Sequence, residues 1–432
     1  MTRLARQLAA LDAAPPLRLA GRLTQLSGLA LEAALAGVRL GELVEVERPG
    51  TPLLAEVVGL RGERAVLLPL GDPAGVGLDA EVRPRGGPLA VPVGRALLGR
   101  VLDGLGRAID GRPEPAGLVP WAVDRAPPPP LERRPVLEPL VFGLRAIDGL
   151  LTAGRGQRLG LFAGAGVGKS MLLGQLARGA RADLSVICLV GERGREVGEF
   201  IEEALGEEGL RRSVVVVATS DQPALVRLRA AQVATAIAEW FAAQGAEVLF
   251  LLDSVTRFAR AQREVGLAAG EPPARQGYPA SVFQALPRLL ERTGNRSRGG
   301  ISAVYTVLVA GGDLEEPIAD EVRSILDGHI VLDRRLAERG HFPAIDVLAS
   351  VSRVMPRVAS APHRAAAARV RALLSALEQS RELVRLGAYQ AGSDPITDQA
   401  LALREPLEAF LRQPADEVEP LEVTLARLGQ LA

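Results

Sequence analysis

Ala163-Gly-Ala-Gly-Val-Gly-Lys-Ser170 is the stretch that decides the fold of this 432-residue chain. Its glycines let backbone N–H groups converge on phosphate oxygens, and a helix that begins near Lys169 adds its positive end. An apolar strand over residues 159–162 and a helix over residues 170–178 are the context that a phosphate-binding turn requires. The usual pattern has glycine where this chain has Ala163, and a chance glycine turn is the alternative.

Lys169 is the only lysine of the chain, so the rest of the 51 lysines and arginines are all arginine. A compact ammonium fits a tight turn in which a flat, forked guanidinium would not fit the same space. The hydroxyl of Ser170 can ligate Mg²⁺ beside a bound phosphate. The turn therefore predicts a magnesium–nucleotide site, to which we assign Gly164, Ala165, Gly166, Val167, Gly168, Lys169 and Ser170.

The composition is that of a globular protein, with 48% hydrophobic and 24% charged residues. Basic and acidic residues are equal in number, so there is no electrostatic case for a nucleic acid or an anionic membrane as partner. The first residues resemble a secretory signal, but Arg6 and Asp12 interrupt any apolar core, and we expect a cytosolic protein. Leu4, Leu8 and Leu11 instead predict a short amphipathic helix that docks on a partner or on its own domain.

Short apolar stretches punctuated by glycine and proline fill residues 19–85 and predict a small β-barrel. A proline-rich passage at residues 113–130 is typical of an extended connector. From residue 158 to residue 353, short apolar strands alternate with helices, which predicts an α/β core with a parallel sheet buried on both faces. The expected strands of this core are residues 158–162, 185–190, 213–218, 247–252 and 301–309.

The last part of the chain is helical in composition, because alanine, leucine and arginine dominate residues 364–386 and a second helical stretch follows at residues 397–411. We therefore expect a β-barrel domain at residues 1–90, an α/β domain at residues 91–355 and a helical domain at residues 356–432.

Two carboxylates are candidates for the chemistry of a magnesium–nucleotide site. Asp253 ends the apolar run 248–252 and could hold a water on the metal, although many ordinary strands end in an aspartate cap. Gly191-Glu192-Arg193 directly follows the apolar strand at residues 185–190, where the Glu192 carboxylate could act as a general base towards water. Alternatively, Glu192 belongs to a solvated ion-pair cluster at a helix start, together with Arg193, Arg195 and Glu196.

Several longer motifs follow one another in a fixed order. They are Gly-Ala-Gly-Val-Gly-Lys-Ser (164–170), Gly-Glu-Arg-Gly-Arg-Glu-Val (191–197), Ala-Thr-Ser-Asp-Gln-Pro-Ala (218–224), Asp-Ser-Val-Thr-Arg-Phe-Ala-Arg-Ala-Gln-Arg-Glu (253–264) and Glu-Pro-Ile-Ala-Asp-Glu-Val-Arg-Ser-Ile-Leu-Asp-Gly-His-Ile (316–330). Over residues 21–392 the chain resembles the ATPases of type III secretion systems, flagellar or injectisome, which are similar to the catalytic subunits of rotary ATP synthases. The resemblance implies a RecA-like P-loop core.

The same resemblance implies roles for single residues. Glu192 would activate water and Arg193 would help to position the γ-phosphate, while Lys169 would bind phosphate. Phe342 matches the aromatic position that packs on adenine in the rotary family, with an ordinary buried phenylalanine as the alternative. Arg353 aligns with the arginine finger that reaches the nucleotide of a neighbouring subunit, where a guanidinium would neutralise developing charge.

A residue that acts on a neighbouring subunit implies a homohexameric ring. We therefore expect an isolated monomer to bind ATP but to hydrolyse it poorly. The resemblance further implies ATP and Mg²⁺ as ligands, a central stalk protein in the pore and a stator-like regulator at the amino terminus. It also implies chaperone–cargo complexes at the carboxy-terminal helices, an export gate as partner, and a place at the cytoplasmic face of the inner membrane.

Three other functions compete with a protein-export ATPase. A subunit of a rotary ion-translocating ATPase shares the fold, but Gly387-Ala-Tyr-Gln-Ala-Gly-Ser-Asp-Pro395 is similar to export ATPases. A hexameric helicase needs a basic, aromatic-bearing groove, whereas aromatic content is 3% and net charge is zero. A non-catalytic ring subunit is disfavoured because all the expected catalytic residues are present. Within the export ATPases, Gly266-Leu-Ala-Ala-Gly-Glu-Pro-Pro273 favours the injectisome branch.

Overall fold

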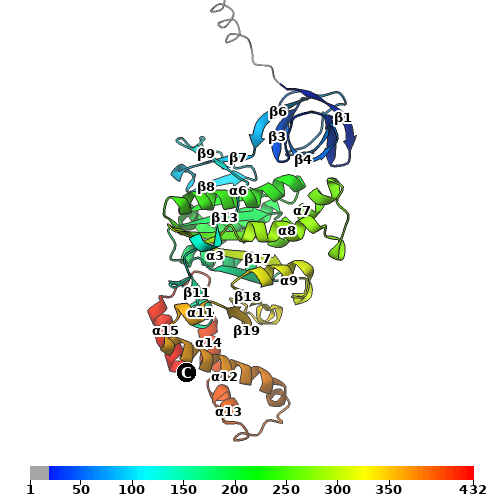
Figure 1. Cartoon of the computed structure of the whole chain (residues 1–432). Coiled ribbons are helices and arrows are strands. Elements are labelled where there is room, and N and C mark those ends of the chain that lie inside the picture. Colours follow the sequence, from blue (N-terminus) through cyan, green and yellow to red (C-terminus); the bar gives the residue numbers. More distant parts are fainter. Residues whose placement is uncertain (1–18) are drawn as a thin grey trace, which may run out of the picture. The chain divides into compact units, whose positions relative to one another are not determined.

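The computed structural model describes residues 19–432 (Figure 1). The short helix expected at Leu4, Leu8 and Leu11 lies outside these residues. The chain divides into two units, one that ends at Leu89 and one that runs from Ala90 to Ala432.

In the first unit the strands close into an antiparallel barrel in the order β1-β2-β5-β4-β3-β6. Apolar side chains such as Leu31 and Ala33 of β2 point into the barrel, while Glu32 between them does not, as the two-residue period of a strand requires. The barrel predicted from the sequence is thus confirmed. Its strands are β1 (Gly21–Ser27), β2 (Ala30–Ala34), β3 (Glu42–Val46), β4 (Leu53–Arg61), β5 (Arg64–Pro69) and β6 (Glu81–Pro88).

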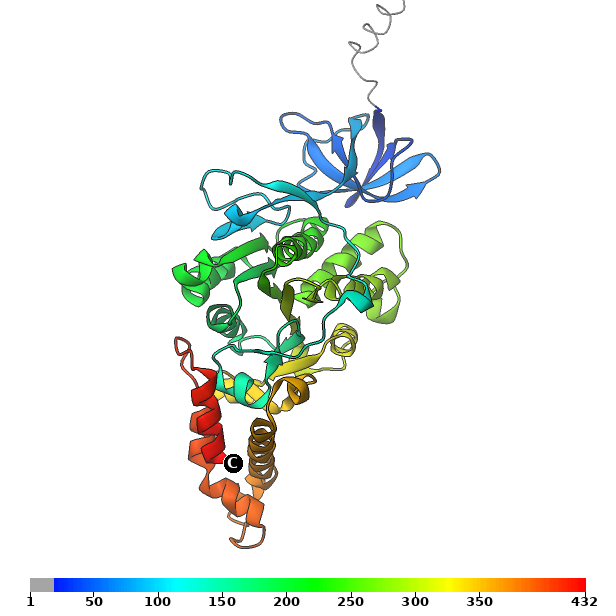
Figure 2. The same cartoon turned by 60° about the vertical axis from the view of Figure 1, so that its left-hand side comes forward.

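The second unit is built on a large sheet in the order β19-β18-β12-β17-β15-β13-β14-β8, which is parallel except for β19. Every residue of β13 and β14 is buried, so helices cover both faces of the sheet, as the continuous apolar runs predict (Figure 2). The strands are β8 (Arg100–Asp103), β12 (Arg158–Ala163), β13 (Leu184–Val190), β14 (Ser213–Ala218), β15 (Glu247–Asp253), β17 (Gly300–Leu308), β18 (Gly328–Leu332) and β19 (Ile345–Ser352).

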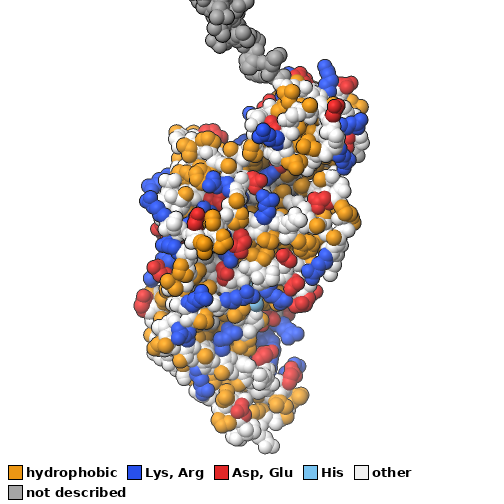
Figure 3. Space-filling model, viewed as in Figure 1, with side chains coloured by type: hydrophobic (Ala, Val, Ile, Leu, Met, Phe, Trp, Pro, Cys, Tyr) orange, Lys and Arg blue, Asp and Glu red, His pale blue; other side chains and the backbone are white. Residues whose placement is uncertain are grey.

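The longest helix of the core, α6 (Ala224–Ala243), packs along β13, β14 and β15, and α7 packs on α6 and β17. The remaining helices of the core are α2 (Arg145–Leu150), α3 (Lys169–Gly179), α4 (Gly194–Glu199), α5 (Gly206–Arg211), α7 (Val255–Ala268), α8 (Ala280–Leu290), α9 (Pro317–Ile325) and α10 (Arg334–Glu338), and a π-helical segment, Phe200–Leu205, joins α4 to α5. Acidic and basic side chains are interspersed on the face of the molecule in Figure 3.

The expected connector at residues 113–130 contains a short strand, β9 (Val119–Ala122), which pairs with β7 (Ala90–Val93). Small pairings also join β10 (Pro139–Leu140) to β11 (Ala153–Gly154) and β16 (Gly294–Asn295) to β17. None of the helices within residues 19–432 has the length and the apolar character that crossing a membrane requires.

The chain ends in helices that follow the sheet: α11 (Met355–Val358), α12 (Ala361–Arg385), α13 (Pro395–Ala402), α14 (Arg404–Leu411) and α15 (Leu421–Leu431). The stretch 397–411, expected as one helical region, is split between α13 and α14. These helices pack on α2 of the core, where the buried guanidinium of Arg145 lies 3.1 Å from Glu419 Oε2 and 2.5 Å from Glu417 Oε1. The α/β core with its parallel sheet and the carboxy-terminal helical region are confirmed.

Candidate active site

The glycine-rich turn lies between the end of β12 and the start of α3, as the sequence predicts. Gly166 and Gly168 have φ angles of +75° and +82°, a conformation that glycine adopts far more readily than other residues. Val167 is buried and anchors the turn, while Ala165 and Gly166 are exposed. Because Gly168 caps α3 without a side-chain hydrogen bond, the first backbone N–H groups of the helix are available to an anion.

Lys169 points from this turn towards two carboxylates on other strands. Its Nζ atom lies 2.5 Å and 2.7 Å from the two carboxylate oxygens of Asp253, and 3.3 Å from Glu192 Oε1. Asp253 is the last residue of β15, and Glu192 follows the end of the neighbouring strand β13. The parallel strands therefore bring the lysine and both predicted carboxylates together at the carboxyl edge of the sheet.

The carboxyl group of Glu192 is in a setting that suits proton transfer. Burial raises the pKa of Glu192 to about 7, against the opposite effect of the Lys169 ammonium. Its second oxygen, Oε2, accepts a hydrogen bond from Arg257 Nη2 at 2.9 Å. A carboxyl group that titrates near neutrality can accept a proton at physiological pH.

The alternative placed Glu192 in a solvated ion-pair cluster, but Glu192 is buried and meets that cluster only through a side-chain hydrogen bond with Glu196. Arg193 Nη1 lies 3.7 Å from Glu196 Oε1 and Arg195 Nη1 lies 3.1 Å from Glu199 Oε1, so the two pairs follow the length of the short helix α4. The Arg193 side chain is 76% exposed, and within residues 19–432 it makes no hydrogen bond or ion pair with the groups around the turn. The structure does not bring Arg193 to Lys169, and its role in positioning a phosphate stays a prediction.

Phe342 lies beside the phosphate-binding turn, although it is far away in sequence. Its ring carbons lie 3.3 Å and 3.4 Å from the position that a β-carbon on Gly168 would occupy. The side chain is 46% exposed, so it is not the ordinary buried phenylalanine that was the alternative. The N–H of Gln413, which precedes α15, donates to the carbonyl of Phe342 at 2.9 Å and ties this residue to the carboxy-terminal helices.

Arg353 directly follows β19 and is exposed. Its Nη2 atom donates to the carbonyl of Arg323 at 3.5 Å, and within residues 19–432 it makes no bond to Lys169, Glu192 or Asp253. In a single chain, therefore, Arg353 is not part of the site.

Ser170 is exposed in the first turn of α3, and its hydroxyl is free of hydrogen bonds to the described residues. Residues 19–432 contain no cluster of three or more histidine, cysteine or acidic side chains that could hold a metal ion alone. Mg²⁺ is commonly held by one or two protein ligands together with substrate phosphates. Ser170 follows Lys169 in the sequence, and the carboxylate of Asp253 contacts Lys169 in space. The free Ser170 hydroxyl and the Asp253 carboxylate therefore fit that kind of site.

Two further residues of the site were not identified from the sequence. Arg257, in the first turn of α7, was quoted in a motif without a role, yet it pairs with Glu192 and packs so closely on Gly191 that a β-carbon there would meet its side chain at 2.8 Å. Thr306 of β17, the strand between β12 and β15, donates to Asp253 Oδ1 at 2.7 Å. Its position in a continuous apolar strand gave no sequence signal.

Three family models match the chain. The nucleotide-binding domain of the ATP synthase alpha/beta family matches residues 143–352, and the β-barrel domain of the same family matches residues 24–86. The carboxy-terminal domain of the T3SS ATPase EscN matches residues 359–430.

The curated relatives include proteins named for the flagellum and proteins named for type 3 secretion, and both are similar to the chain along nearly its whole length. The "Flagellum-specific ATP synthase" of Pseudomonas aeruginosa is 53% identical over 95% of this chain and 92% of its own length. The "SPI-2 type 3 secretion system ATPase" of Salmonella typhimurium is 52% identical over 95% of this chain and 94% of its own length.

Among solved structures, the assembled ATPase EscN of the enteropathogenic E. coli type III secretion system is similar, with a TM-score of 0.91 and 45% identity over 95% of this chain and 99% of that chain. EscN in complex with its central stalk EscO matches with a TM-score of 0.89 at the same identity and coverage. The family models match the segments that contain the barrel, the phosphate-binding turn and the carboxy-terminal helices. The chain belongs to the family of type III secretion and flagellar export ATPases, within the wider ATP synthase alpha/beta family.

Proposed function

We propose that this chain hydrolyses ATP, with Mg²⁺, to energise chaperone release, unfolding and export of proteins through a type III secretion apparatus. One observation carries the enzymatic part: the Lys169 ammonium of the phosphate-binding turn lies between the carboxylates of Asp253 and Glu192. A phosphate-binding cation, a candidate metal ligand and a candidate base thus meet at one edge of the sheet. This is the set of groups that phosphoryl transfer to water requires.

In this proposal, each group at the site has its own task. Lys169 and the backbone N–H groups of residues 164–170 would bind the phosphates, and Ser170 and Asp253 would hold Mg²⁺. When bound, the metal ion supplies positive charge that offsets the charge of the phosphate oxygens. Glu192 accepts the proton of the attacking water, and Arg257 keeps the Glu192 carboxylate oriented.

Phe342 packs on the adenine ring in this proposal. It is supported by the half-exposed position of the ring beside Gly168, because an aromatic face next to the phosphate turn can stack on a base. Arg193 is proposed to approach the γ-phosphate only when its exposed side chain leaves Glu196.

We infer that the active form is a homohexamer in which Arg353 completes the site of the neighbouring subunit. The inference is supported by the exposed position of Arg353, away from Lys169 and Glu192 of its own chain. It is also supported by the similarity to EscN, which is described as an assembled ATPase. A guanidinium lent by a neighbour would neutralise charge on the transferred phosphoryl group.

The other expected partners belong to the same proposal. A central stalk protein is supported by the complex of EscN with its central stalk EscO. Four other expectations about partners stay predictions. They are a stator-like regulator at the amino terminus, chaperone–cargo complexes at the carboxy-terminal helices, an export gate, and the absence of a nucleic-acid partner. The position at the cytoplasmic face of the inner membrane and the domain limits at residues 90 and 355 also stay predictions.

The choice between an injectisome and a flagellum stays a prediction, and we keep the injectisome branch on the strength of residues 266–273. The chain is 53% identical to a flagellar relative and 52% identical to a secretion relative, so sequence identity favours neither the flagellar nor the injectisome branch. Expression of the chain in strains that lack either their flagellar or their injectisome ATPase would decide, because only the matching machine should regain export. A rotary ion-translocating subunit is disfavoured by the match of residues 359–430 to the T3SS carboxy-terminal domain.

ATP hydrolysis measured against protein concentration, with the molecular mass recorded alongside, tests the proposal. We expect the wild type to gain specific activity as it assembles, because the site needs a neighbour. Glu192→Gln should bind nucleotide with unchanged affinity and hydrolyse none, since it keeps Lys169 but loses the base. Arg353→Ala should assemble yet remain inactive. Full specific activity in a dilute monomer would contradict the proposal.

A further inference from the structure

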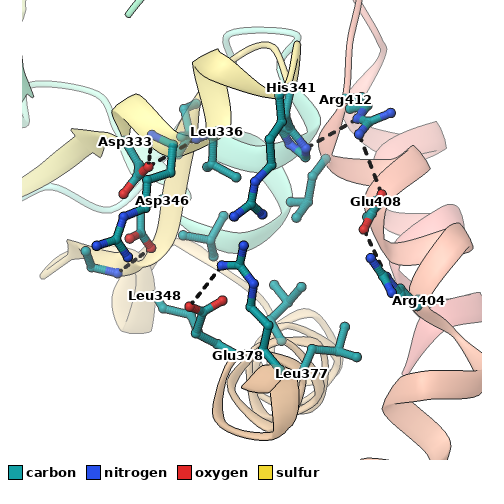
Figure 4. Close-up of a pocket in the computed structure, with 18 of the residues that line it drawn as sticks. Asp333, Leu336, His341, Asp346, Leu348, Leu377, Glu378, Arg404, Glu408 and Arg412 are labelled. Carbon is teal, nitrogen blue, oxygen red and sulfur yellow. Dashed lines mark hydrogen bonds and ion pairs between the residues drawn. The ribbon is translucent and has the colours of Figure 1, made fainter. Parts of the chain in front are cut away.

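A second cavity lies away from the phosphate-binding turn, between the end of the α/β core and the carboxy-terminal helices (Figure 4). It has a volume of about 780 Å³ and is bordered by α10 and β19 on one side and by α12, α13 and α14 on the other. Lys169, Glu192 and Asp253 are absent from its described lining, so the cavity has no part in the site already described.

The floor of this groove is apolar. Leu336 comes from α10 and Leu348 from β19, and Leu348 is 38% exposed although it is a large aliphatic side chain. The other large apolar side chains of the lining come from β19 and from the carboxy-terminal helices: Ile345, Val347, Leu374, Leu377, Val384, Leu401 and Leu411. Such a floor favours a ligand with aliphatic side chains.

The rim of the groove is basic. The described lining contains six arginines, Arg335, Arg339, Arg381, Arg385, Arg404 and Arg412, against four acidic residues. His341 adds no charge at neutral pH, because burial and the nearby Arg412 lower its pKa. The groove therefore carries a net positive charge in a chain whose overall net charge is zero.

The acidic residues of the rim are already used within the chain. Asp333 accepts hydrogen bonds from the first N–H groups of α10, and Asp346 accepts from the N–H of Ala349 at 2.9 Å. Glu408 lies 3.3 Å from Arg404 and 3.6 Å from Arg412 (Figure 4).

Glu378, the fourth acid, pairs with Arg381 at 3.5 Å. The guanidinium groups of Arg335, Arg339 and Arg385 make no ion pair with any described residue. Arg335 and Arg339 belong to the α10 side of the groove, whereas Arg385 ends α12 on the other side. The unpaired charges therefore flank the apolar floor from two sides.

We propose that this groove is a docking site for an acidic amphipathic helix of a partner protein. The apolar face of such a helix would cover the leucines, and its flanking carboxylates would reach Arg335 and Arg339 on one side and Arg385 on the other. A helix about 10 Å wide fills 780 Å³ with roughly two turns, which is enough for anchors at i, i+3, i+4 and i+7. The inference deepens the proposed function, because it names the kind of partner that the carboxy-terminal helices take.

Charge complementarity selects this occupant. The first 18 residues of this chain carry Arg3, Arg6 and Arg18 against the single acid Asp12, so they have the same sign as the groove. A polyanion without apolar groups would satisfy the arginines but leave the leucines in water. An acidic amphipathic helix satisfies both features.

Fluorescence anisotropy with synthetic helical peptides tests the proposal on the full-length protein. The probe is a labelled peptide of about four turns with leucine on one face and glutamate on its flanks. We expect binding that weakens as salt rises, because the arginines are exposed and their charges are screened. Arg335→Glu and Arg385→Glu should each weaken binding about fivefold, the effect of about 1 kcal/mol lost at one charge pair.

Arg95→Glu is the matched control, since it makes the same charge change at an exposed arginine outside the groove. It should bind the probe like the wild type. A peptide with lysine in place of glutamate should bind the double variant Arg335→Glu/Arg385→Glu more tightly than it binds the wild type. A variant that had lost its fold would not gain affinity for this peptide. A third peptide with serine in place of leucine should fail to bind.

Equal binding of the acidic peptide by Arg385→Glu and Arg95→Glu would overturn the proposal. So would full binding of the serine peptide, because the groove would then recognise charge alone, as a polyanion site does. ATP hydrolysis measured on the same samples separates this inference from the proposed function. If a wild type that hydrolyses ATP does not bind the acidic peptide, the docking proposal is wrong and the proposed enzymatic function stands. If the wild type does not hydrolyse ATP, the proposed enzymatic function is wrong.

Discussion

Lys169 Nζ lies 2.5 Å and 2.7 Å from the two oxygens of Asp253, so the only lysine of the chain holds the carboxylate that ends β15, two strands away from β12 in the sheet. A bound phosphate would compete with Asp253 for this ammonium. The proposed phosphate-binding cation is thus paired and only 12% exposed, and in our proposal the same carboxylate would turn to a metal ion.

Lys169→Arg should lower kcat/KM for ATP at least about a hundredfold, because a forked guanidinium cannot take the place of a compact ammonium in this turn. Steady-state hydrolysis checks the expectation, and thermal unfolding confirms that the variant is folded. Arg95→Lys, the reverse exchange at an exposed position, should hydrolyse ATP like the wild type. Unimpaired turnover by Lys169→Arg would refute the role of this lysine.

The pH dependence of hydrolysis should report Glu192. Its pKa of about 7, raised by burial, means that the carboxyl group is protonated and unable to accept a proton at lower pH. We expect kcat/KM to rise with pH through about 7 and to be about tenfold lower at pH 6 than on the plateau.

Arg257 provides the control for this assignment. The Arg257 guanidinium lowers the pKa of Glu192, so Arg257→Gln should move the acidic limb of the profile to higher pH. Two results would contradict the assignment of Glu192 as the base. One is an acidic limb whose midpoint lies at the ordinary pKa of a glutamate, and the other is a limb that does not move in Arg257→Gln.

Phe342→Ala should weaken ATP binding about tenfold to a hundredfold, the loss expected when a base no longer stacks on an aromatic ring. Hydrolysis at saturating ATP should be retained, because the groups around Lys169 are unchanged. Inhibition by inorganic tripolyphosphate, which has no base, should be the same in both proteins. Equal ATP affinity of variant and wild type would rule out adenine stacking on Phe342.

Arg145→Ala should lower the free energy of unfolding of the second unit by about 3 kcal/mol. The side chains of Arg145 and Glu419 are each only 4% exposed, and removing the arginine deprives a buried carboxylate of one of its partners. Arg211→Ala, which breaks an exposed pair with Glu207, should leave the free energy of unfolding nearly unchanged. Denaturant unfolding compares the two, and similar values would show that Arg145 does not tie the helices to the core.

Much of the fold follows from local sequence patterns. The strand at residues 213–218 was predicted with the bounds of β14, and the phosphate-binding turn was placed correctly between β12 and α3, because apolar runs and glycines report on local geometry. The strands β18 and β19 were not predicted. Polar residues such as His329 and Asp346 interrupt them, so they lack the continuous apolar pattern of the central strands.

The site was harder to predict than the fold, since its contacts join distant parts of the chain. Lys169, Glu192 and Asp253 were expected to serve one magnesium–nucleotide site because each comes at or just after the end of an apolar strand. Thr306 was missed because a threonine in a buried strand looks like any β-branched residue. The exposed pairing of Arg193 with Glu196 depends on how α4 begins, which no motif reveals.

The central claim is that the site is completed by Arg353 of a neighbouring subunit, and mixing two inactive variants tests it most directly. In rings formed from equal amounts of Arg353→Ala and Glu192→Gln, some boundaries pair an intact Glu192 with an intact Arg353 from the next subunit. With random mixing, about a quarter of the boundaries are complete, and we predict about a quarter of the wild-type hydrolysis rate. A mixture as inactive as its two components would contradict the account.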